Sequence, residues 1–575
     1  MCGIAGIVSK TSRDLGPLLE AMLRAQHHRG PDGAGMVVGT HCQRKSTVEA
    51  LDFRNQFGTI ALGHVRLAIT GGATGVQPFQ TPDGRLSLLH NGEIYNYRKL
   101  WKSLMGPAQP ASSSDSEVFF KLLANEYRGD LVYALEKVLP HLDGVYGTAV
   151  TDQHHTIIAR DRIGVRQLYY CFGKGLTAFA SEKKSLKALF GNDVEIHRLP
   201  PGHMMILGEN GHELRAFWTP DQIRTNDTIE DVSKALSAYK NELKEAVWKR
   251  IHDRDHVGII YSGGIDSFMI ASLVKQLGVP FTCYTAGRGE DAPDITWAKK
   301  TAKEHGFPLR VKTLSKNEIE ELIPEVMKAI EDHSLNQVEV AIPIFASIRM
   351  AQEAGERVIL TGQGADELFG GYPWYAAIVD REGYDQFVER SWEDTFLLYK
   401  ECLEREDKIA MNHSMELRVP YVDPQVIEVA FAIAPQLKIR KGGDPLQKRI
   451  HRALSIVLGV PEEVAFREKE AAQHGANVHD VFEELARSHG YSKDLLNAAN
   501  YDSNISVQEK LGSSSRYGYR YGDRSLWKPS PHVQYYLDTL AAEIGLLTGL
   551  PKLQWNATRE KLTALGLSNG RTSKS

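Results

Sequence analysis

One stretch near the middle of the chain restricts the folds that the chain can adopt. The apolar residues 257–260 lead into the turn Ser262-Gly263-Gly264-Ile265-Asp266-Ser267, and an apolar helical pattern follows. A strand, turn and helix of this kind present backbone N–H groups and a helix N-terminus, which together bind phosphate. A second apolar run, residues 282–287, follows at the spacing of a β-α-β unit. We therefore expect an α/β domain with a doubly wound parallel sheet, in which Ile260 ends the first strand.

A lone Gly-Gly turn is most often only a tight connection, so a second turn of this kind matters. Residues 357–360 form another apolar run, which ends in Thr361-Gly362-Gln363-Gly364-Ala365-Asp366. Each of the two turns thus carries a carboxylate, Asp266 or Asp366. Carboxylates beside bound phosphates are ligands for the magnesium that accompanies ATP. The two turns together indicate a site for ATP and Mg²⁺.

The start of the chain carries a candidate nucleophile, Cys2, in Met1-Cys2-Gly3-Ile4. If Met1 is removed, Cys2 has both a thiol and a free α-amine, and this amine can act as the base that activates the thiol. Cysteine is also common in buried strands, where it behaves as a small hydrophobic residue. These few residues leave both interpretations open.

Two motifs farther along the first half decide how Cys2 is interpreted. Arg66 lies within the apolar residues 60–69, where an arginine needs an anionic partner, either a structural carboxylate or a ligand. The pair Asn91-Gly92 follows another apolar run and would normally form a hairpin turn. The same pair can also offer a side-chain amide and a backbone N–H to a developing oxyanion. Both motifs therefore suit a nucleophile that attacks an amide.

These residues belong to a series of motifs that resembles the class II glutamine amidotransferases. In order, the motifs are Cys2-Gly3-Ile4, Arg29-Gly30-Pro31-Asp32, Asn91-Gly92-Glu93, Ser114-Asp115-Ser116-Glu117, Arg160-Asp161…Gly164 and Ser181-Glu182. The resemblance implies the α+β N-terminal-nucleophile (αββα) fold and a thioester between Cys2 and the glutamine side chain. It also implies three further roles: an oxyanion hole of Asn91 and Gly92, α-carboxylate binding by Arg66, and α-amine binding by Glu93 and Asp115.

The second half resembles the synthetase domain of the glutamine-hydrolysing asparagine synthetases, which is an N-type ATP pyrophosphatase domain. Besides the two glycine-rich turns, the resemblance rests on Arg418-Val419-Pro420-Tyr421-Val422-Asp423, Lys448-Arg449-Ile450-His451-Arg452 and Arg467-Glu468-Lys469-Glu470. It implies that ATP converts a carboxylate to an acyl-adenylate, which ammonia from the first domain then attacks. The implied ATP-binding residues are Ile260, Ser262, Gly263, Gly264, Asp266, Ser267, Thr361 and Gly362, and Lys469 would stabilise charge on the α-phosphate.

The implied acceptor pocket departs from the pattern of this family. Glu331 is kept, but Glu339 stands where the family has an arginine that pairs with the aspartate substrate. Gln363 replaces a glutamate, and Gln167 replaces a proline, which we expect to alter a turn near the domain interface. The reversed charge at Glu339 disfavours a substrate carboxylate. Either the acceptor carries an amine that faces Glu339, or a neighbouring residue supplies the positive charge and the acceptor is aspartate.

The leading prediction is a glutamine- and ATP-dependent amide-forming ligase. One alternative is a lactam- or macrocycle-forming synthetase of the same superfamily, although the intact set around Cys2 argues against it. The other is a non-catalytic binding or regulatory homologue, against which Asp266, Asp366 and Lys469 argue. The predicted domains are a glutaminase (1–215), a linker (216–240), an ATP pyrophosphatase domain (241–490) and a partly helical C-terminal extension (491–575).

Composition adds limits on partners and location. The net charge of -4 implies no general affinity for polyanions, and there is no apolar run of the roughly 18 residues that a membrane span needs. The N-terminus does not have the pattern of a secretory signal, and five widely spaced cysteines favour a reducing cytoplasm. The Arg- and Tyr-rich residues 513–524 are expected to pack on the synthetase domain in preference to contacting nucleic acid. The oligomeric state stays open, with a homodimer as one option.

Overall fold

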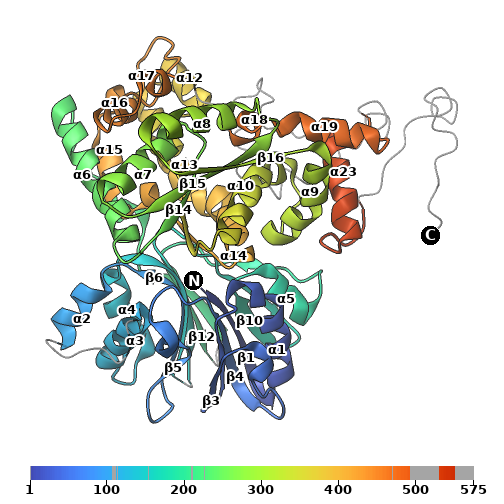
Figure 1. Cartoon of the computed structure of the whole chain (residues 1–575). Helices are drawn as coiled ribbons and strands as arrows, with labels where there is room; N and C mark the ends of the chain where they lie inside the picture. Colours follow the sequence, from blue (N-terminus) through green and yellow to red (C-terminus); the bar gives the residue numbers. More distant parts are fainter. Residues whose placement is uncertain are drawn as a thin grey trace. The chain divides into compact units, whose positions relative to one another are not determined.

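The computed structural model describes residues 2–105, 112, 114–152, 154–208, 211–225, 227–468, 471–492 and 530–550. The chain divides into two compact units. Figure 1 labels the helices and strands along the chain. Unit 1 comprises residues 1–285, 297–310 and 347–469, and unit 2 comprises residues 286–296, 311–346 and 470–575. Unit 1 therefore contains the whole amidotransferase-like half together with both glycine-rich turns.

Two antiparallel sheets form the first half of unit 1. The strands of one sheet are β1 (Cys2–Asp14), β2 (Ala34–Val38), β3 (His41–Lys45), β4 (Phe57–Arg66), β9 (Tyr169–Gly173), β10 (Leu176–Ala180) and β11 (His197–Arg198). Those of the other are β5 (Phe79–Gln80), β6 (Ser87–Ile94), β7 (Gly144–Thr151), β8 (Thr156–Arg160), β12 (His203–Gly208) and β13 (Gly211–Ala216). The strand orders are β11-β9-β10-β1-β4-β2-β3 and β13-β12-β8-β7-β6-β5.

The two sheets pack face to face, and helices cover their outer faces. Apolar side chains that alternate along the strands, among them Ile4, Leu89 and Met205, form a buried layer between the sheets. Helices α1 (Gly16–Ala25) and α5 (Lys183–Phe190) bury the outer face of the first sheet. Helices α3 (Asp115–Glu126) and α4 (Leu131–Val138) bury that of the second, and α2 (Tyr97–Met105) packs on α3. The predicted αββα fold is confirmed.

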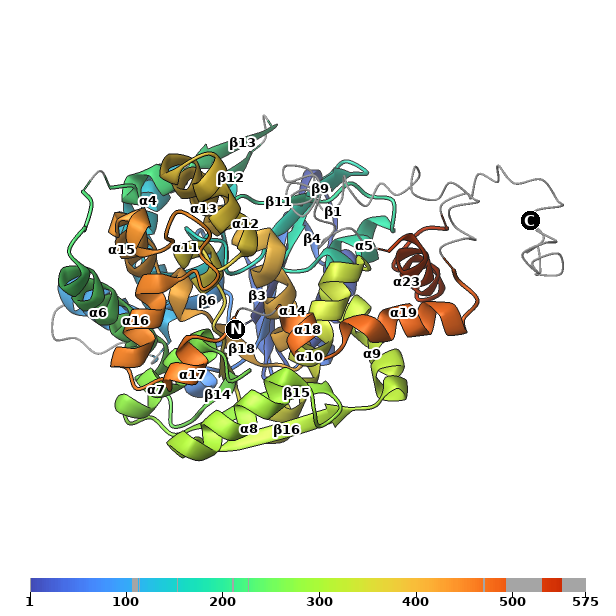
Figure 2. The ribbon, with the colours of Figure 1, turned by 90° about the horizontal axis from the view of Figure 1, so that it is seen from above.

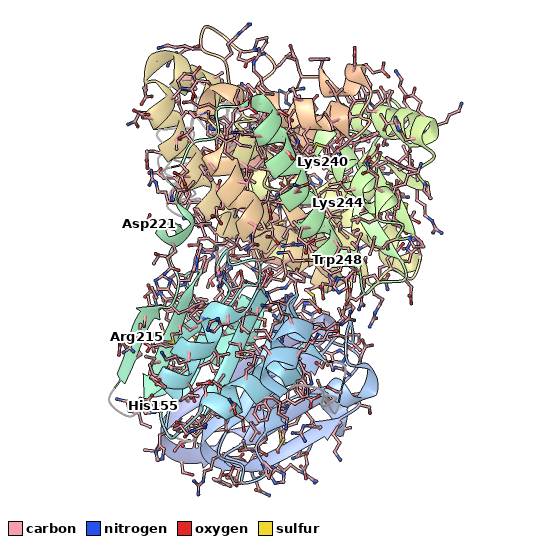
Figure 3. The ribbon with its side chains drawn as sticks, turned by 90° about the vertical axis from the view of Figure 1, so that its left-hand side faces the viewer. His155, Arg215, Asp221, Lys240, Lys244 and Trp248 are labelled. Carbon is pink, nitrogen blue, oxygen red and sulfur yellow. The ribbon has the colours of Figure 1, made fainter. Side chains whose placement is uncertain are left out.

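Residues 217–231 connect the two halves of unit 1. After β13 the chain forms a short 3-10 helix, η5 (Pro220–Ile223), and then α6 (Val232–Ile251). The side chain of Asp231 caps α6, because it accepts a hydrogen bond from a backbone N–H of the first turn. Figure 3 shows this path, with Asp221 in η5 and Lys240 and Lys244 along α6. Helix α6 therefore begins within the predicted linker (216–240).

A five-stranded sheet organises the second half of the chain. Its strands are β14 (Val257–Ile260), β15 (Phe281–Arg288), β16 (Leu309–Leu314), β17 (Val358–Leu360) and β18 (Glu416–Arg418), in the order β16-β15-β14-β17-β18. Strand β14 pairs in parallel with β15 and β17, and β17 pairs in parallel with β18. This confirms the predicted parallel sheet. Because the chain leaves β14 toward β15 and returns on its other side at β17, a ligand crevice is expected at the carboxyl ends of β14 and β17.

Helices surround this sheet within unit 1. They are α7 (Ile265–Gln276), α11 (Ala365–Phe369), α12 (Pro373–Arg381), α13 (Tyr384–Leu398), α14 (Glu404–Asn412), α15 (Pro424–Ala432), α16 (Arg449–Val457) and α17 (Glu462–Ala465). Helices α6, α7 and α16 pack on one another (Figure 2). Helix α7 is apolar around most of its circumference, with nine of its twelve residues buried, as expected of a crossover helix between a sheet and other helices.

Unit 2 is mainly helical. It contains α9 (Lys316–Ile330), the first part of α10 (Leu335–Glu353), α18 (Ala472–Gly475), α19 (His479–Ser488) and α23 (Pro531–Glu543), while α8 (Pro293–His305) begins in it. The side chain of Gln534 on α23 accepts a hydrogen bond from the N–H of Leu335 (2.9 Å) and donates one to the carbonyl of His333 (3.0 Å). The C-terminal helix is thus tied to the start of α10. The Arg- and Tyr-rich residues 513–524 lie outside the described residues.

Buried charges join the two halves of unit 1. The fully buried guanidinium of Arg29 donates to the carbonyl of Cys2 (3.0 Å) and to Asp407 on α14 (3.1 Å). Arg166 donates to the other carboxylate oxygen of Asp407 (2.8 Å) and to the carbonyl of Leu417 (3.1 Å). The adjacent Gln167, which replaces the proline of the family pattern, is also buried. It lies next to Arg166 in the sequence and is therefore close to the contact between the two halves, as expected.

No helix in the described part of the chain has both the length and the apolar character needed to cross a membrane.

We expect Asp407→Asn to lower the free energy of unfolding by about 3–5 kcal/mol, since two buried guanidinium groups lose their shared counter-charge. Urea unfolding followed by tryptophan fluorescence measures this change. Asp52→Asn is the matched control, because the ion pair of Asp52 with Arg54 is exposed, and its unfolding midpoint should not move. An unchanged midpoint for Asp407→Asn would contradict the stabilising role of the shared carboxylate.

Candidate functional site

Cys2 lies at the first position of β1, directly opposite Arg66 on β4. Its backbone N–H donates to Oδ1 of Asn91 (2.9 Å), and its thiol lies 4.0 Å from the carbonyl of Leu67. Burial raises the pKa of the Cys2 thiol. The thiol is therefore protonated unless a base acts on it, and the nearest backbone nitrogen is its own.

Arg66 is buried, and within the described residues its guanidinium forms no ion pair. It donates one hydrogen bond, to the carbonyl of Thr70 (2.9 Å). A Cβ added at Gly75 would lie 2.6 Å from Nη2 of Arg66, so a glycine at this position leaves room for the arginine side chain. A buried cation without a counter-charge is costly. Of the two explanations for Arg66, a structural salt bridge and a ligand, the geometry favours the ligand.

Asp115 lies on the same side of the site, as the first residue of α3. One carboxylate oxygen accepts from the hydroxyl of Thr70 (3.2 Å), and the other accepts from the N–H of Ile94 (2.9 Å). Thr70 therefore contacts both Arg66, through its carbonyl, and Asp115, through its hydroxyl. The cation and the anion predicted to hold the two ends of an amino acid are thus linked by one residue.

Asn91 and Gly92 lie inside strand β6, opposite Gly147 and Tyr146 of β7. The hairpin turn that is usual for an Asn-Gly pair is therefore wrong for this chain. The reason is packing, because a Cβ at Gly92 would lie 2.1 Å from the carbonyl oxygen of Val145. The Asn91 side chain accepts from Cys2 and its Nδ2 donates to the hydroxyl of Ser181 (3.3 Å), which fixes the amide beside Cys2.

Glu93 is buried on the same strand, and its nearest cation is Arg418, at 3.5 Å. Burial, with the nearby carboxylates of Asp115 and Glu416, holds the pKa of Glu93 well above its usual range, although Arg418 opposes this shift. Arg418 belongs to β18 of the second half. The structure thus places Glu93 at the boundary between the glutaminase half and the synthetase half.

The predicted phosphate loop connects β14 to α7 as expected. Gly264 is the N-cap of α7, and its N–H donates to the hydroxyl of Ser262 (3.3 Å). The hydroxyl of Ser267 donates to the carbonyl of Gly264 (3.2 Å) and accepts from the N–H of Ser262 (3.3 Å). Gly263 has φ +70°, and a Cβ there would lie 2.5 Å from the carbonyl carbon of Trp297. Only glycine meets both demands.

The second turn lies next to the first. Strands β14 and β17 pair through Ile259 and Leu360, so Ile260 and Thr361 leave the sheet side by side. A Cβ added at Gly362 would lie 3.1 Å from Cβ of Asp266. The predicted nucleotide-binding residues of the two turns are therefore brought together at one edge of the sheet.

Two carboxylates converge on one ammonium group at this edge. Nζ of Lys448 lies 2.8 Å from Asp266 and 2.6 Å from Asp366, and Nε2 of His451 lies 2.9 Å from Asp266. Magnesium beside ATP is typically held by one or two carboxylates together with phosphate oxygens. Two carboxylates that share one cation position fit this donor set. Lys448 stands out in the sequence, but nothing there indicates that it joins the two aspartates.

The residues predicted for the acceptor pocket lie in different units. In unit 2, Glu331 follows α9 with φ 56°, and buried Glu339 forms an ion pair with His479 at 2.7 Å. In unit 1, Nε2 of Gln363 donates to the buried Glu406 on α14 (2.5 Å). Glu406 and His479 are contacts that the sequence does not reveal, because each is more than 40 residues from its partner. Lys469 lies outside the described residues.

Comparisons with known proteins agree with this geometry. Residues 1–199 match the glutamine amidotransferase domain, and residues 238–395 and 379–538 match asparagine synthase. A Methanocaldococcus jannaschii protein named as a glutamine-hydrolysing asparagine synthetase is 32% identical over 86% of this chain and 97% of its own. Asparagine synthetase 1 of Lotus japonicus is 28% identical over 87% of this chain and 82% of its own. The chain therefore belongs to the family of glutamine-hydrolysing asparagine synthetases, ligases that use glutamine and ATP to form an amide.

Proposed function

We propose that this chain synthesises asparagine from aspartate, with glutamine as the nitrogen donor and ATP as the activating nucleotide. The observation that carries the glutaminase assignment is the buried guanidinium of Arg66, which has no acidic partner in the described residues and lies opposite Cys2. A free amino acid would supply the missing carboxylate. Both relatives named above are glutamine-hydrolysing enzymes, so the ring-closing and non-catalytic alternatives have no support from them.

In the proposed first half-reaction, Cys2 attacks the side-chain amide of glutamine. Removal of Met1 would free the α-amine of Cys2, which takes the thiol proton and later gives it to the leaving ammonia. The amide of Asn91 and the N–H of Gly92 would stabilise the oxyanion of the tetrahedral intermediate. Water then hydrolyses the thioester and releases glutamate.

Three side chains, those of Arg66, Asp115 and Glu93, would orient the glutamine. The guanidinium of Arg66 would bind the α-carboxylate, while Asp115 and Glu93 would accept hydrogen bonds from the α-ammonium. Thr70 supports this arrangement, because it already contacts both Arg66 and Asp115. Ammonia would then pass inside the protein to the synthetase half, since in water it would become ammonium.

We expect Cys2→Ala to abolish glutamine-dependent asparagine formation and leave ammonia-dependent formation intact, because the thiol acts only in glutamine hydrolysis. Glutamate release and asparagine formation from each nitrogen source measure the two activities. Cys42→Ala is the control, since Cys42 is a free cysteine on β3 away from the site, and it should change neither activity. Loss of both activities in Cys2→Ala would show that its role has been misassigned.

In the proposed second half-reaction, the two glycine-rich turns bind ATP. Backbone N–H groups of Gly263 and Gly264 and the hydroxyls of Ser262 and Ser267 would hold the pyrophosphate, while Thr361 and Gly362 face the nucleotide. Asp266 and Asp366 would hold Mg²⁺, which screens the phosphate charge. Lys469 would stabilise the α-phosphate as the carboxylate attacks.

Gly371→Ala should lower aspartate-dependent exchange of pyrophosphate into ATP by about 10²-fold. A Cβ at this position would lie 2.0 Å from Oδ1 of Asp366 and 2.3 Å from Cε of Lys448, so the Asp366 carboxylate must move. Isotope exchange measures adenylation alone, and glutamine hydrolysis by the same variant controls for folding. Asp366→Asn should show the same loss, and full exchange activity in Gly371→Ala would count against the assigned metal site.

The proposed acceptor is aspartate because His479 restores the positive charge that the family arginine would supply. Glu339 is 4% exposed, whereas the side chain of His479 is 44% exposed, so the outward charge of this ion pair is the imidazolium. The hydrogen bond that His479 donates to Glu339 raises the pKa of His479, and the charges of Asp480 and Glu483 add to the shift, although burial opposes it. The centroid of the His474 ring lies 4.6 Å from that of the His479 ring.

We expect His479→Gln to raise the KM for aspartate by roughly ten- to a hundred-fold, since a charged hydrogen bond to the substrate carboxylate is lost. In the unmodified enzyme, KM should rise as pH increases through the raised pKa of His479, because the imidazolium loses its charge there. His474→Gln is the matched control and should leave KM unchanged. If the unmodified enzyme gave no pyrophosphate exchange with aspartate, but did so with an amine-bearing carboxylate, Glu339 would be the acceptor-binding group instead.

Two further proposals concern the location of the protein and its oligomeric state. All five cysteines are free, which supports a reducing cytoplasm as the location. We also propose that the enzyme is a homodimer, which sedimentation of the full chain would test.

A further inference from the structure

Glu406 on α14 is a buried carboxylate that contacts the second nucleotide-binding turn. Its Oε1 atom accepts the hydrogen bond from Gln363 at 2.5 Å, and Nη2 of Arg405 lies 3.6 Å from the same oxygen. The side chain of Glu406 is fully buried. The carboxylate is thus held from one side, through one of its two oxygens.

The second carboxylate oxygen of Glu406 is in a different environment from the first. Within the described residues, Oε2 is buried and has no hydrogen-bond partner. A buried polar atom without a partner costs roughly 1–3 kcal/mol, and more when it is charged. Burial also raises the pKa of Glu406 to about 7, although Arg405 and the hydrogen bonds from Thr361 and Gln363 oppose the shift. A carboxylate in this state can take up or release a proton near neutral pH.

The position of α14 links Glu406 to the source of the nitrogen. The next residue, Asp407, is the carboxylate shared by Arg29 and Arg166 of the glutaminase half. Glu404, one residue before Arg405, pairs with Arg198 of the same half at 2.7 Å. Glu406 contacts instead the turn that contains Thr361 and Gln363. Helix α14 therefore contacts the glutaminase half through two carboxylates and the ATP site through a third.

Amide formation requires a proton acceptor at the ATP site. When ammonia attacks the carbonyl carbon of the acyl-adenylate, a C–N bond forms and the nitrogen becomes positively charged. The C–O bond to AMP then breaks, and the nitrogen must lose one proton to give a neutral amide. AMP leaves as its phosphate anion, so the released proton needs a base close to the attacking nitrogen.

We propose that Glu406, oriented by Gln363, accepts the proton that the attacking ammonia loses as the amide forms. The free Oε2 atom is the accepting atom, and Gln363 holds Oε1 as a neutral donor that does not compete for the proton. This inference rests on the proposed function and deepens it. The proposal also assigns a role to Gln363, whose side chain orients the carboxylate that accepts the proton.

The test is Glu406→Gln in the full chain, which keeps the size of the side chain and removes its basicity. Glutamate release from glutamine and aspartate-dependent pyrophosphate exchange should be unchanged, because neither step needs this base. Asparagine formation from ammonia should fall by about 10²-fold or more. Hydroxylamine should restore product formation, as the hydroxamate, because its conjugate acid is far more acidic than ammonium and loses its proton to water more readily.

Glu401→Gln is the matched control. Burial also raises the pKa of Glu401 to about 7, and the residue lies five residues before Glu406, so the same chemical change is made nearby in the sequence. This variant should form asparagine at the unmodified rate. Wild-type asparagine formation by Glu406→Gln, or equal losses with ammonia and hydroxylamine, would overturn the proposal. If the unmodified enzyme showed no aspartate-dependent exchange of pyrophosphate into ATP, the proposed function itself would be refuted. This result requires no variant, so it can be distinguished from a failure of the Glu406 proposal.

Discussion

The carboxylate of Asp407 is the interaction on which the union of the two halves depends. It accepts from Arg29 and Arg166 at 3.1 and 2.8 Å, and all three side chains are fully buried. Arg29 also donates to the carbonyl of Cys2, so the proposed nucleophile is held by a side chain that is itself held by the synthetase half. Because buried charges tolerate little displacement, the spacing of the halves and the placement of Cys2 are set together.

The sheets of the glutaminase half explain why residues far apart in sequence form one site. Cys2 and Arg66 lie opposite each other on β1 and β4, while Asn91 comes from β6 of the other sheet. Their side chains meet where the two sheets face each other. Strand pairing therefore fixes the distances, and Thr70 with its two hydrogen bonds adds the final orientation of Arg66 and Asp115.

The sequence predicted those parts of the protein that depend on local patterns. The strand, glycine-rich turn and helix at 257–276 follow from contiguous residues. The ion pairs of Asp407 with Arg29 and Arg166 could not be predicted from the sequence, because a helical pattern does not distinguish a buried carboxylate from an exposed one. The strand position of Asn91 was also missed, since the packing of Gly92 against Val145 depends on a strand more than 50 residues away.

The two departures from the family pattern follow one physical rule. Glu339 is a buried negative charge where the family pattern predicts a positive one, and its ion pair with the half-exposed His479 supplies a compensating cation. Gln363 removes a negative charge, and Glu406 supplies one within hydrogen-bonding distance. In both cases a change in charge is matched by a second residue from a distant helix. Burial explains this pairing, because an uncompensated change of charge in a low-dielectric interior costs more than the rest of a site can offset.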